Sequence, residues 1–163
     1  MVTGRQFIVE GEPISNPTLY IQAIGALQYL SNTRPDIAFS VNKLSQYMSS
    51  PTTDHWQGIK RIMRYLHGTT NLCLHIKPSI DLDIAGFSDA DWATSIDDKK
   101  SMAGECVFLG ETLISWASRK QRVVSWSSTR SEYRALADLA VKVAWIRSLL
   151  GELKFPMPMK PIL

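Results

Sequence analysis

The chain has 163 residues, of which 45% are hydrophobic and 20% charged, with a formal net charge of +3 at pH 7. This composition is typical of a globular protein and excludes an intrinsically disordered chain. The small positive charge permits a polyanionic partner without requiring one.

The two cysteines, Cys73 and Cys106, lack the spacing of a metal site or a CxxC motif, which is typical of a reducing compartment. The opening residues, MVTGRQFIVEGEP, lack the layout of a signal peptide. Charged residues interrupt the most apolar long stretch, residues 135–150, so it is not expected to span a bilayer. We therefore expect a soluble, intracellular protein without a membrane segment.

Apolar residues at helical spacing predict two helices early in the chain, over residues 18–31 and 33–50. In the second helix, Pro35 and Asp36 suit the first turn, because proline needs no amide partner there and an acid favours the positive end of the helix dipole. Thr33 is the expected N-cap residue of this helix.

A third helix is predicted over residues 52–68, with Thr52 or Thr53 as the N-cap. Its expected apolar stripe consists of Trp56, Ile59, Met63 and Leu66. Basic residues lie largely outside this stripe and include Lys60, Arg61 and Arg64.

The pattern then changes to the period of strands. Alternation predicts a strand at 72–76, and three further strands are expected at 82–90, 104–110 and 112–118, the last two joined as a hairpin. The stretch at 122–126 is a candidate brief extension of the sheet.

A long helix is predicted to begin near residue 127. Its expected buried face consists of Tyr133, Leu136, Ala140, Val143 and Leu150. The order of helices, antiparallel meander and long helix predicts an α+β protein, with a domain boundary near 77–81.

Asp89 and Asp91 follow an apolar run and would share one face of a continuing strand. Two carboxylates on one face are candidate ligands of a hard divalent cation. The alternative, which these residues alone favour, is a strand that ends in an Asp-rich turn.

Glu132 lies three residues after Thr129, at the start of the long helix. This spacing is that of a capping box, in which the glutamate accepts a hydrogen bond from the N-cap amide. Taken alone, Glu132 therefore requires no function beyond capping.

Arg119, Lys120 and Arg122 form a basic cluster flanked by Trp116 and Trp126. Basic side chains near aromatic rings are typical of surfaces that bind phosphates and sugars. A solvated surface loop is the simpler interpretation of the same residues.

Two long stretches resemble one protein family. Residues 25–69 read GALQYLSNTRPDIAFSVNKLSQYMSSPTTDHWQGIKRIMRYLHGT, and residues 86–137 read GFSDADWATSIDDKKSMAGECVFLGETLISWASRKQRVVSWSSTRSEYRALA. The first resembles the segment that follows the polymerase region of copia-type retrotransposon Pol polyproteins, especially plant members. The second resembles the opening half of their ribonuclease H domain. The resemblance implies a helical connection region at 1–77 and a truncated ribonuclease H-like domain at 78–163.

The ribonuclease H of this family hydrolyses the RNA strand of RNA–DNA hybrids by two-metal chemistry. The resemblance implies that Asp89 is the first-strand aspartate of the metal site and that Glu132 is its helical glutamate. Both are therefore expected to be catalytic residues and ligands of Mg²⁺ or Mn²⁺. Asp91 belongs to the same motif without being an expected main ligand.

The chain also departs from the family pattern. The family's third aspartate lies in a CDN-like strand that would follow residues 160–163, and the upstream polymerase site is also absent from the sequence. Where the family reads SRSSTEAEYRAL, this chain reads SWSSTRSEYRAL, which places Arg130 beside Glu132. We therefore expect an incomplete carboxylate set, doubtful metal binding, a chain that is inactive alone, and a sheet with an unpaired edge.

The expected function is that of a fragment of a retrotransposon reverse transcriptase and ribonuclease H. One alternative is a non-catalytic module that binds RNA–DNA hybrid or duplex through 119–122 and the basic side of 52–68. The sequence is also compatible with a relic reading frame or with one part of a longer Pol protein.

Overall fold

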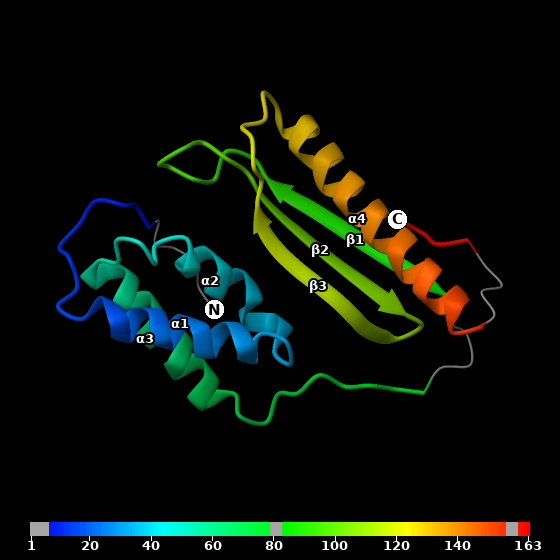
Figure 1. The fold of residues 1–163 in the computed structure, drawn as a ribbon, viewed down its shortest axis with the longest axis horizontal. Helices are drawn as coiled ribbons and strands as arrows, with labels where there is room; N and C mark the ends of the chain where they lie inside the picture. Colours follow the sequence, from blue (N-terminus) through cyan, green and yellow to red (C-terminus); the bar gives the residue numbers. More distant parts are fainter. Residues whose placement is uncertain (1–6, 79–82, 156–159) are drawn as a thin grey trace. The chain divides into compact units, whose positions relative to one another are not determined.

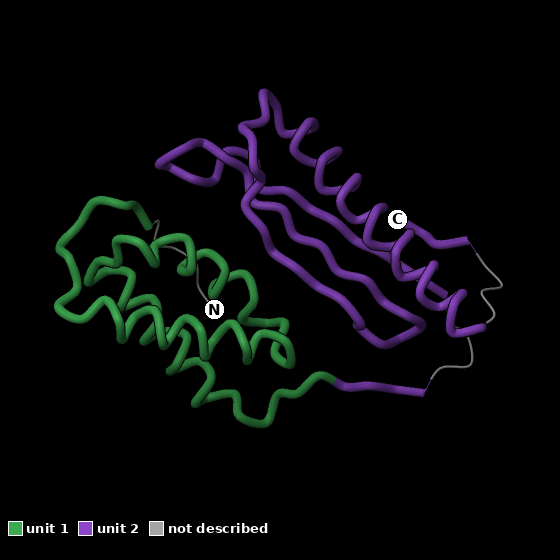
Figure 2. Tube along the Cα trace, in the orientation of Figure 1, with its two compact units in different colours: residues 1–74 green, residues 75–163 purple. Residues whose placement is uncertain are grey.

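The computed structural model describes residues 7–78, 83–155 and 160–163. It divides the chain into two compact units, unit 1 (residues 1–74) and unit 2 (residues 75–163), which are coloured separately in Figure 2. The division falls just before the expected boundary at 77–81, most of which lies outside the described residues. The described elements are helices and an antiparallel sheet, which confirms the α+β class.

The helices described in unit 1 are α1 (Pro17–Leu30), α2 (Pro35–Ser45) and α3 (Thr53–Gly68), which are labelled in Figure 1. Their starts follow from local sequence. The Asn16 side chain accepts a hydrogen bond from the Leu19 amide at 3.1 Å, and α1 and α2 each begin with a proline. Thr52 caps α3 as predicted, and its amide donates to Nδ1 of His55 at 3.0 Å.

Three details of this region were predicted wrongly. The N-cap of α2 is Arg34, while the Thr33 hydroxyl donates to the Leu30 carbonyl at 3.1 Å. The predicted helix at 33–50 is too long, because α2 ends at Ser45. On α3, Met63 is 44% exposed, and the buried stripe consists of His55, Ile59 and Ile62.

The core of unit 1 forms where the apolar sides of α1, α2 and α3 meet. It consists of Tyr20, Ile24, Leu27, Ile37, Val41, Leu44, Ile59 and Ile62. Its one hydroxyl is satisfied, because Tyr20 donates to the Leu44 carbonyl at 2.8 Å, and burial raises the pKa of this tyrosine.

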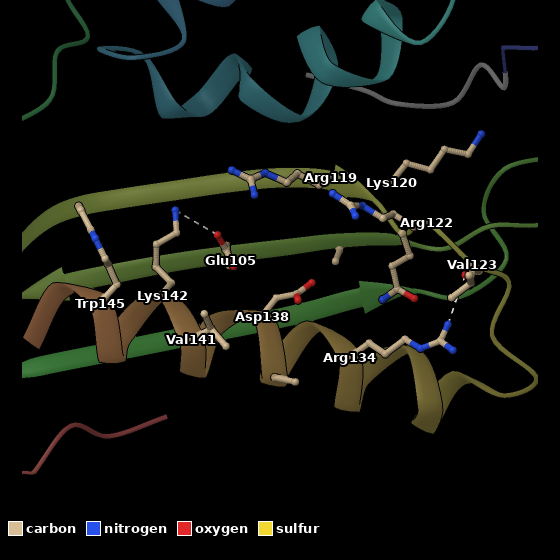
Figure 3. A pocket seen from close by; sticks show the side chains of 13 residues that line it. Glu105, Arg119, Lys120, Arg122, Val123, Arg134, Asp138, Val141, Lys142 and Trp145 are labelled. Carbon is tan, nitrogen blue, oxygen red and sulfur yellow. Dashed lines mark hydrogen bonds and ion pairs between the residues drawn. The ribbon is translucent and has the colours of Figure 1, made fainter. Parts of the chain in front are cut away.

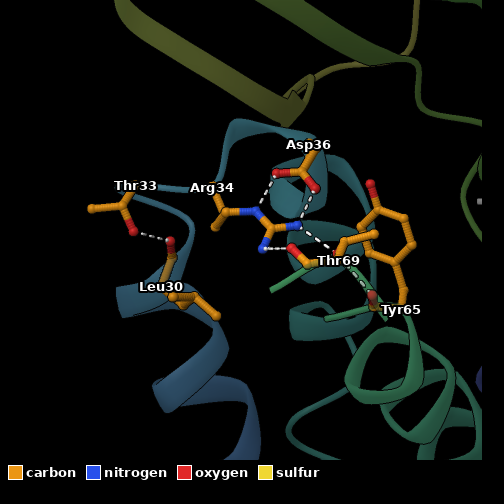
Figure 4. A network of polar contacts seen from close by, with 6 residues as sticks. All are labelled: Leu30, Thr33, Arg34, Asp36, Tyr65 and Thr69. Carbon is orange, nitrogen blue, oxygen red and sulfur yellow. Dashed lines mark hydrogen bonds and ion pairs between the residues drawn. The ribbon is translucent and has the colours of Figure 1, made fainter. Parts of the chain in front are cut away.

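A polar network ties the turn before α2 to the end of α3 (Figure 4). The buried Arg34 guanidinium donates to both carboxylate oxygens of Asp36, at 3.0 and 2.8 Å. It also donates to the carbonyl and the hydroxyl of Thr69, at 3.1 and 2.9 Å. Its Cζ atom lies 5.9 Å from the ring centroid of Tyr65. Arg34 therefore satisfies the carbonyl of Thr69, the C-cap residue of α3, which the helix itself leaves open.

The elements described in unit 2 are β1 (Ile84–Asp91), β2 (Met102–Leu109), β3 (Thr112–Lys120) and α4 (Ser128–Glu152). Within the described residues the sheet has the order β1-β2-β3 with antiparallel neighbours, which confirms the predicted meander. The β2–β3 hairpin turns at Gly110, whose φ of +57° suits glycine.

Helix α4 packs mainly on β1 and to a lesser extent on β2 (Figure 1). The core between them consists of Ile84, Val107, Leu139, Val143 and Ile146. The predicted buried face of α4 was partly right, because Val143 belongs to this core and Leu150 packs against it, but Tyr133 is 69% and Leu136 38% exposed. The face that contacts the sheet is instead marked by Ser131, Ala135, Leu139, Val143 and Ile146.

Two predicted strands are not formed. Residues 72–76 and 122–126 lie outside every strand, although both are described. In the first stretch, Leu72 is 52% and Ile76 is 76% exposed. Alternation of apolar residues therefore does not make a strand where no neighbouring strand offers hydrogen bonds.

The C-terminal residues pair with the outer edge of β1. The Ile162 amide donates to the Ile84 carbonyl at 3.0 Å, and the Gly86 amide donates to the Ile162 carbonyl at 2.9 Å. The bridge between Ala85 and Ile162 is parallel. The edge expected to be unpaired is therefore covered at this point. None of the described helices is long and apolar enough to cross a bilayer.

Candidate functional site

Asp89 lies near the C-terminal end of β1 and is exposed. Because Ile84 and Gly86 face α4, the odd-numbered residues of β1 start on the opposite face. The Asp89 carboxylate turns back to its own backbone, and its Oδ1 accepts a hydrogen bond from the Ala90 amide at 2.8 Å. Even-numbered amides of β1 point to the outer edge, as the bond from Gly86 to the C-terminal residues shows. The carboxylate therefore lies toward this edge.

Glu132 lies in the second turn of α4, is exposed, and does not cap the helix. The N-cap is Ser127, whose hydroxyl accepts a hydrogen bond from the Arg130 amide at 3.2 Å. The predicted capping box between Thr129 and Glu132 was therefore wrong. Glu132 precedes Leu139 by seven residues and so falls near the same stripe of α4, but its side chain is exposed.

The end of β1 and the start of α4 are joined directly. The indole Nε1–H of Trp92, the residue after β1, donates to the Ser125 carbonyl at 2.9 Å, close before α4. The Gln121 side chain donates to the carbonyl of Ser131 at 2.8 Å and accepts from the Ser125 hydroxyl at 3.2 Å. These bonds position the first turns of the helix against the sheet.

Asp89 and Glu132 lie at about the same level of unit 2, meaning at a similar distance from the point where α4 touches β1. A Cβ atom added at Gly86 would lie 3.1 Å from the Leu139 side chain, which marks where helix and strand touch. From there Glu132 is about 10 Å along the helix axis, and Asp89 is about 10 Å along the strand. Both lie toward the same end, because α4 runs opposite to β1 (Figure 1).

The two carboxylates reach this level from different sides, Glu132 from α4 and Asp89 from the outer edge of β1. Among the described residues there is no group of three or more His, Cys, Asp or Glu side chains that could hold a metal ion. Asp91, at the last position of β1, is exposed and does not complete such a group. Within the described residues, the candidate ligands of Mg²⁺ or Mn²⁺ are therefore the carboxylates of Asp89 and Glu132 alone.

The predicted basic cluster lies at the end of β3 and in the loop that follows it. Arg119 and Arg122 are exposed, and no ion pair of either is found within the described ranges. Lys120 differs, because its Nζ lies 2.8 Å from Oδ1 of Asp98. Burial raises the pKa of Asp98, but hydrogen bonds from Lys120, Ser95 and Lys100 outweigh it and hold the pKa well below its usual range. The cluster therefore offers two guanidinium groups, while its lysine is neutralised.

The same residues line a groove of about 830 Å³ between β3, the loop after it and α4 (Figure 3). Small side chains at Ala103 and Ala137 help to leave it open, since α4 packs toward β1. The charged and aromatic lining that sequence reasoning missed consists of Glu105, Arg134, Asp138, Lys142 and Trp145. A signal was present, because Arg134, Asp138 and Lys142 recur every four residues and so share one helix face.

Two of these cations already have partners. The Arg134 guanidinium donates to the Ser125 hydroxyl at 3.0 Å and to the Val123 carbonyl at 3.3 Å. Lys142 Nζ lies 3.5 Å from Glu105 and donates to the Ser115 hydroxyl at 3.3 Å. Arg134 thereby stabilises the loop before α4, and Lys142 connects α4 to strands β2 and β3 of the sheet.

The second predicted basic surface lies on α3 in unit 1. Lys60, Arg61 and Arg64 are all exposed there, and Nε of Arg64 donates to the Lys60 carbonyl at 3.4 Å. Met63, 44% exposed, lies among them. This surface can contact an anionic ligand on its own, as an exposed row of positive charge on one helix.

Among curated proteins, the chain is similar to the retrovirus-related Pol polyproteins from transposons RE2 and RE1 of Arabidopsis thaliana. Each is 45% identical, over 94% and 96% of this chain but only 10% and 11% of the polyproteins. It is also 41% identical to the secreted RxLR effector protein 161 of Plasmopara viticola, over 78% of this chain and 90% of that protein. The chain thus spans about a tenth of the polyproteins. No family model and no solved structure matches it.

Proposed function

Because this chain belongs to the family of copia-type retrotransposon Pol polyproteins, we propose that it acts on RNA–DNA hybrids as part of a reverse transcriptase with ribonuclease H activity. In this proposal unit 1 is the helical connection region and unit 2 is the opening part of the ribonuclease H domain. Asp89 and Glu132 contribute two carboxylates to its metal site, and the remaining ligands come from elsewhere in a Pol polyprotein.

The proposal is supported by the position of Asp89 near the end of β1 and of Glu132 near the start of α4. The bond from Trp92 to Ser125 joins the elements that hold them, and both carboxylates are exposed. A strand end and a helix start that meet in this way can place two carboxylates beside a bound nucleic-acid strand. Glu132 is not needed as a cap, since Ser127 caps α4, and the Asp89 carboxylate accepts a local hydrogen bond from the Ala90 amide at 2.8 Å.

The described residues alone do not fit a complete magnesium site. Mg²⁺ requires near-octahedral oxygen ligation, and two carboxylates supply only part of it while repelling one another. Divalent ions, when bound, would help to activate water and to stabilise the leaving oxygen. We therefore assign no step of hydrolysis to this chain and propose that it does not cleave hybrids by itself.

A cleavage assay tests the catalytic part of the proposal. The pure chain is incubated with a hybrid that carries end-labelled RNA, in Mg²⁺ or Mn²⁺, beside the variants Asp89→Asn and Glu132→Gln. We expect no cleavage that depends on Asp89. Cleavage by the wild-type chain that Asp89→Asn abolishes would show that the chain completes its own metal site.

A binding assay with RNA–DNA hybrid tests the nucleic-acid-binding part of the proposal. If Arg119 and the exposed cations of α3 contact phosphates, the affinity falls steeply with salt. Reversing the charge of Arg119 and Lys120 should weaken binding without changing sequence preference. A chain that binds no hybrid at low salt would contradict the proposed function.

A second candidate function is a non-catalytic module that holds any duplex nucleic acid. The exposed guanidinium groups of Arg119 and Arg122 favour it, because they are independent of the carboxylates. The candidates differ in the duplex that they prefer. The first predicts tighter binding to an RNA–DNA hybrid than to a DNA duplex of the same sequence, whereas the second predicts similar affinities.

A further inference from the structure

The groove between β3 and α4 has two chemically different ends. Arg119, Arg122 and Arg134 line one part of it, while Val141 and Trp145 line another (Figure 3). Trp145 is 62% exposed and Val141 is 72% exposed, although both are large apolar residues. An indole left open in a cationic groove is a stacking surface rather than part of the core.

The cations that are available to a ligand are Arg119 and Arg122. Lys120 is paired with Asp98 at 2.8 Å, and Lys142 lies 3.5 Å from Glu105. Arg134 is occupied with the loop before α4. An arginine fork can bind two oxygens of one phosphate, so Arg119 and Arg122 present the open anion-binding donors of this groove.

The distance between the two ends of the groove limits the size of the ligand that can contact both. Arg134 and Trp145 are eleven positions apart on α4, about 16 Å along its axis, so one mononucleotide would not occupy both ends. A duplex also does not suit the indole, because its bases are already stacked inside the helix. An unpaired strand offers both a phosphate chain and the open face of a base.

We propose that this groove binds single-stranded nucleic acid, with phosphates on Arg119 and Arg122 and one unpaired base on Trp145. The inference rests on the proposed function and adds a class of ligand to it, namely a strand that leaves the hybrid or precedes it. Asp138 lies on the same helix face and weakens the positive field of the groove, so Asp138→Asn strengthens this binding.

Titration of the full chain with a labelled oligothymidylate and with a labelled hybrid of equal length tests the proposal, with fluorescence anisotropy as the readout. Trp145→Ala should weaken oligothymidylate binding about tenfold and change hybrid affinity less than about twofold, whereas Trp145→Phe retains most of the affinity, since its ring can still stack. Arg119→Ala with Arg122→Ala should lower the salt slope for the single strand by about 1.4. Arg147→Ala is the matched control, because Arg147 is exposed on the same helix but does not line the groove.

The outcomes separate this inference from the proposed function. If Trp145→Ala binds oligothymidylate as tightly as the wild type does, the groove proposal is overturned, while hybrid binding leaves the proposed function intact. If the chain binds oligothymidylate through Trp145 but binds no hybrid, the groove proposal stands and the proposed function fails. If Arg147→Ala weakens binding as much as the double arginine variant does, the contacts are non-specific and the groove proposal fails. Circular dichroism confirms that each variant is folded.

Discussion

The indole of Trp92 and the main-chain carbonyl of Ser125 are joined by a hydrogen bond of 2.9 Å, although they are far apart in the chain. This bond connects the end of the strand that carries Asp89 to the start of the helix that carries Glu132. The relative position of the two carboxylates therefore depends on a side chain that belongs to neither.

Replacing Trp92 with phenylalanine should test this connection. The ring remains but the N–H donor is lost, so the free energy of unfolding should fall by about 1 kcal/mol. Urea unfolding followed by circular dichroism measures the change. Trp126→Phe is the control, because Trp126 is 86% exposed and its replacement should change stability by less than about 0.5 kcal/mol. Equal effects of the two changes would show that the hydrogen bond is not stabilising.

Arg34→Ala should be strongly destabilising for unit 1. It leaves the Asp36 carboxylate and the Thr69 carbonyl without their guanidinium partner, at a cost of roughly 2–3 kcal/mol. Thermal unfolding measures this loss, and Lys43→Ala is a control that removes a cation outside the network. A loss no larger than that of the control would mean that water replaces the guanidinium without cost.

The Arg34–Asp36 pair should also make stability depend on pH. The hydrogen bond from Arg34 holds the pKa of Asp36 below its ordinary value of 3.8. The stabilisation is therefore complete above that ordinary pKa and is lost as the pH falls through the lower pKa of the folded state. Comparing the melting temperatures of wild type and Asp36→Asn from pH 7 to pH 2 should show a gap that closes only in acid. A gap that is constant with pH would contradict the assignment.

Gly86→Val should destabilise unit 2. A Cβ atom at this position would lie 3.0 Å from the Leu163 side chain and 3.1 Å from Leu139, so the added methyl groups force helix, strand and C-terminal residues apart. The expected cost is about 1–3 kcal/mol in urea unfolding. Gly104→Val is the matched control, since nothing lies within 4 Å of a Cβ there and valine favours strands. The prediction fails if both variants unfold at the same urea concentration.

Asp98→Asn should strengthen nucleic-acid binding. The Asp98 carboxylate pairs with Lys120 at 2.8 Å and with Lys100 at 3.3 Å, so removing its charge leaves Lys120 available beside Arg119 and Arg122. The salt dependence of hybrid binding should become steeper by about 0.9. Glu152→Gln removes one negative charge from an exposed position at the other end of α4, so it shows how much of the change is due to net charge alone.

Local signals in the sequence predicted the starts of some elements, although the caps expected at Thr33 and at Thr129 with Glu132 were wrong. Thr52 was expected to cap α3 and does so, and Pro35 with Asp36 was expected in the first turn of α2, where both lie. The hairpin between β2 and β3 was also predicted, from two residues between two apolar runs. These features succeed because they depend on residues within one turn of each other.

Features that depend on distant partners were not predictable in this way. Helix α4 carries apolar residues on more than one side, so spacing alone did not favour Leu139 and Ile146 over Tyr133 and Leu136. Only contact with β1 decides which side is buried. The groove was missed for the same reason, because Trp145 and Arg119 come to line one groove through the packing of α4 on the sheet and not through their spacing.

The parallel bridge between Ala85 and Ile162 has a kinetic consequence. It joins the first strand of unit 2 to the last described residues, so closing it restricts more chain than any hairpin in the unit. Contacts of such long sequence separation slow folding and are expected to form after the local hairpin and helix. Until this ladder closes, the edge of β1 beside Asp89 offers its hydrogen bonds to any extended chain nearby. Unit 2 is therefore most exposed to mispairing late in folding, at the strand that carries its candidate catalytic residue.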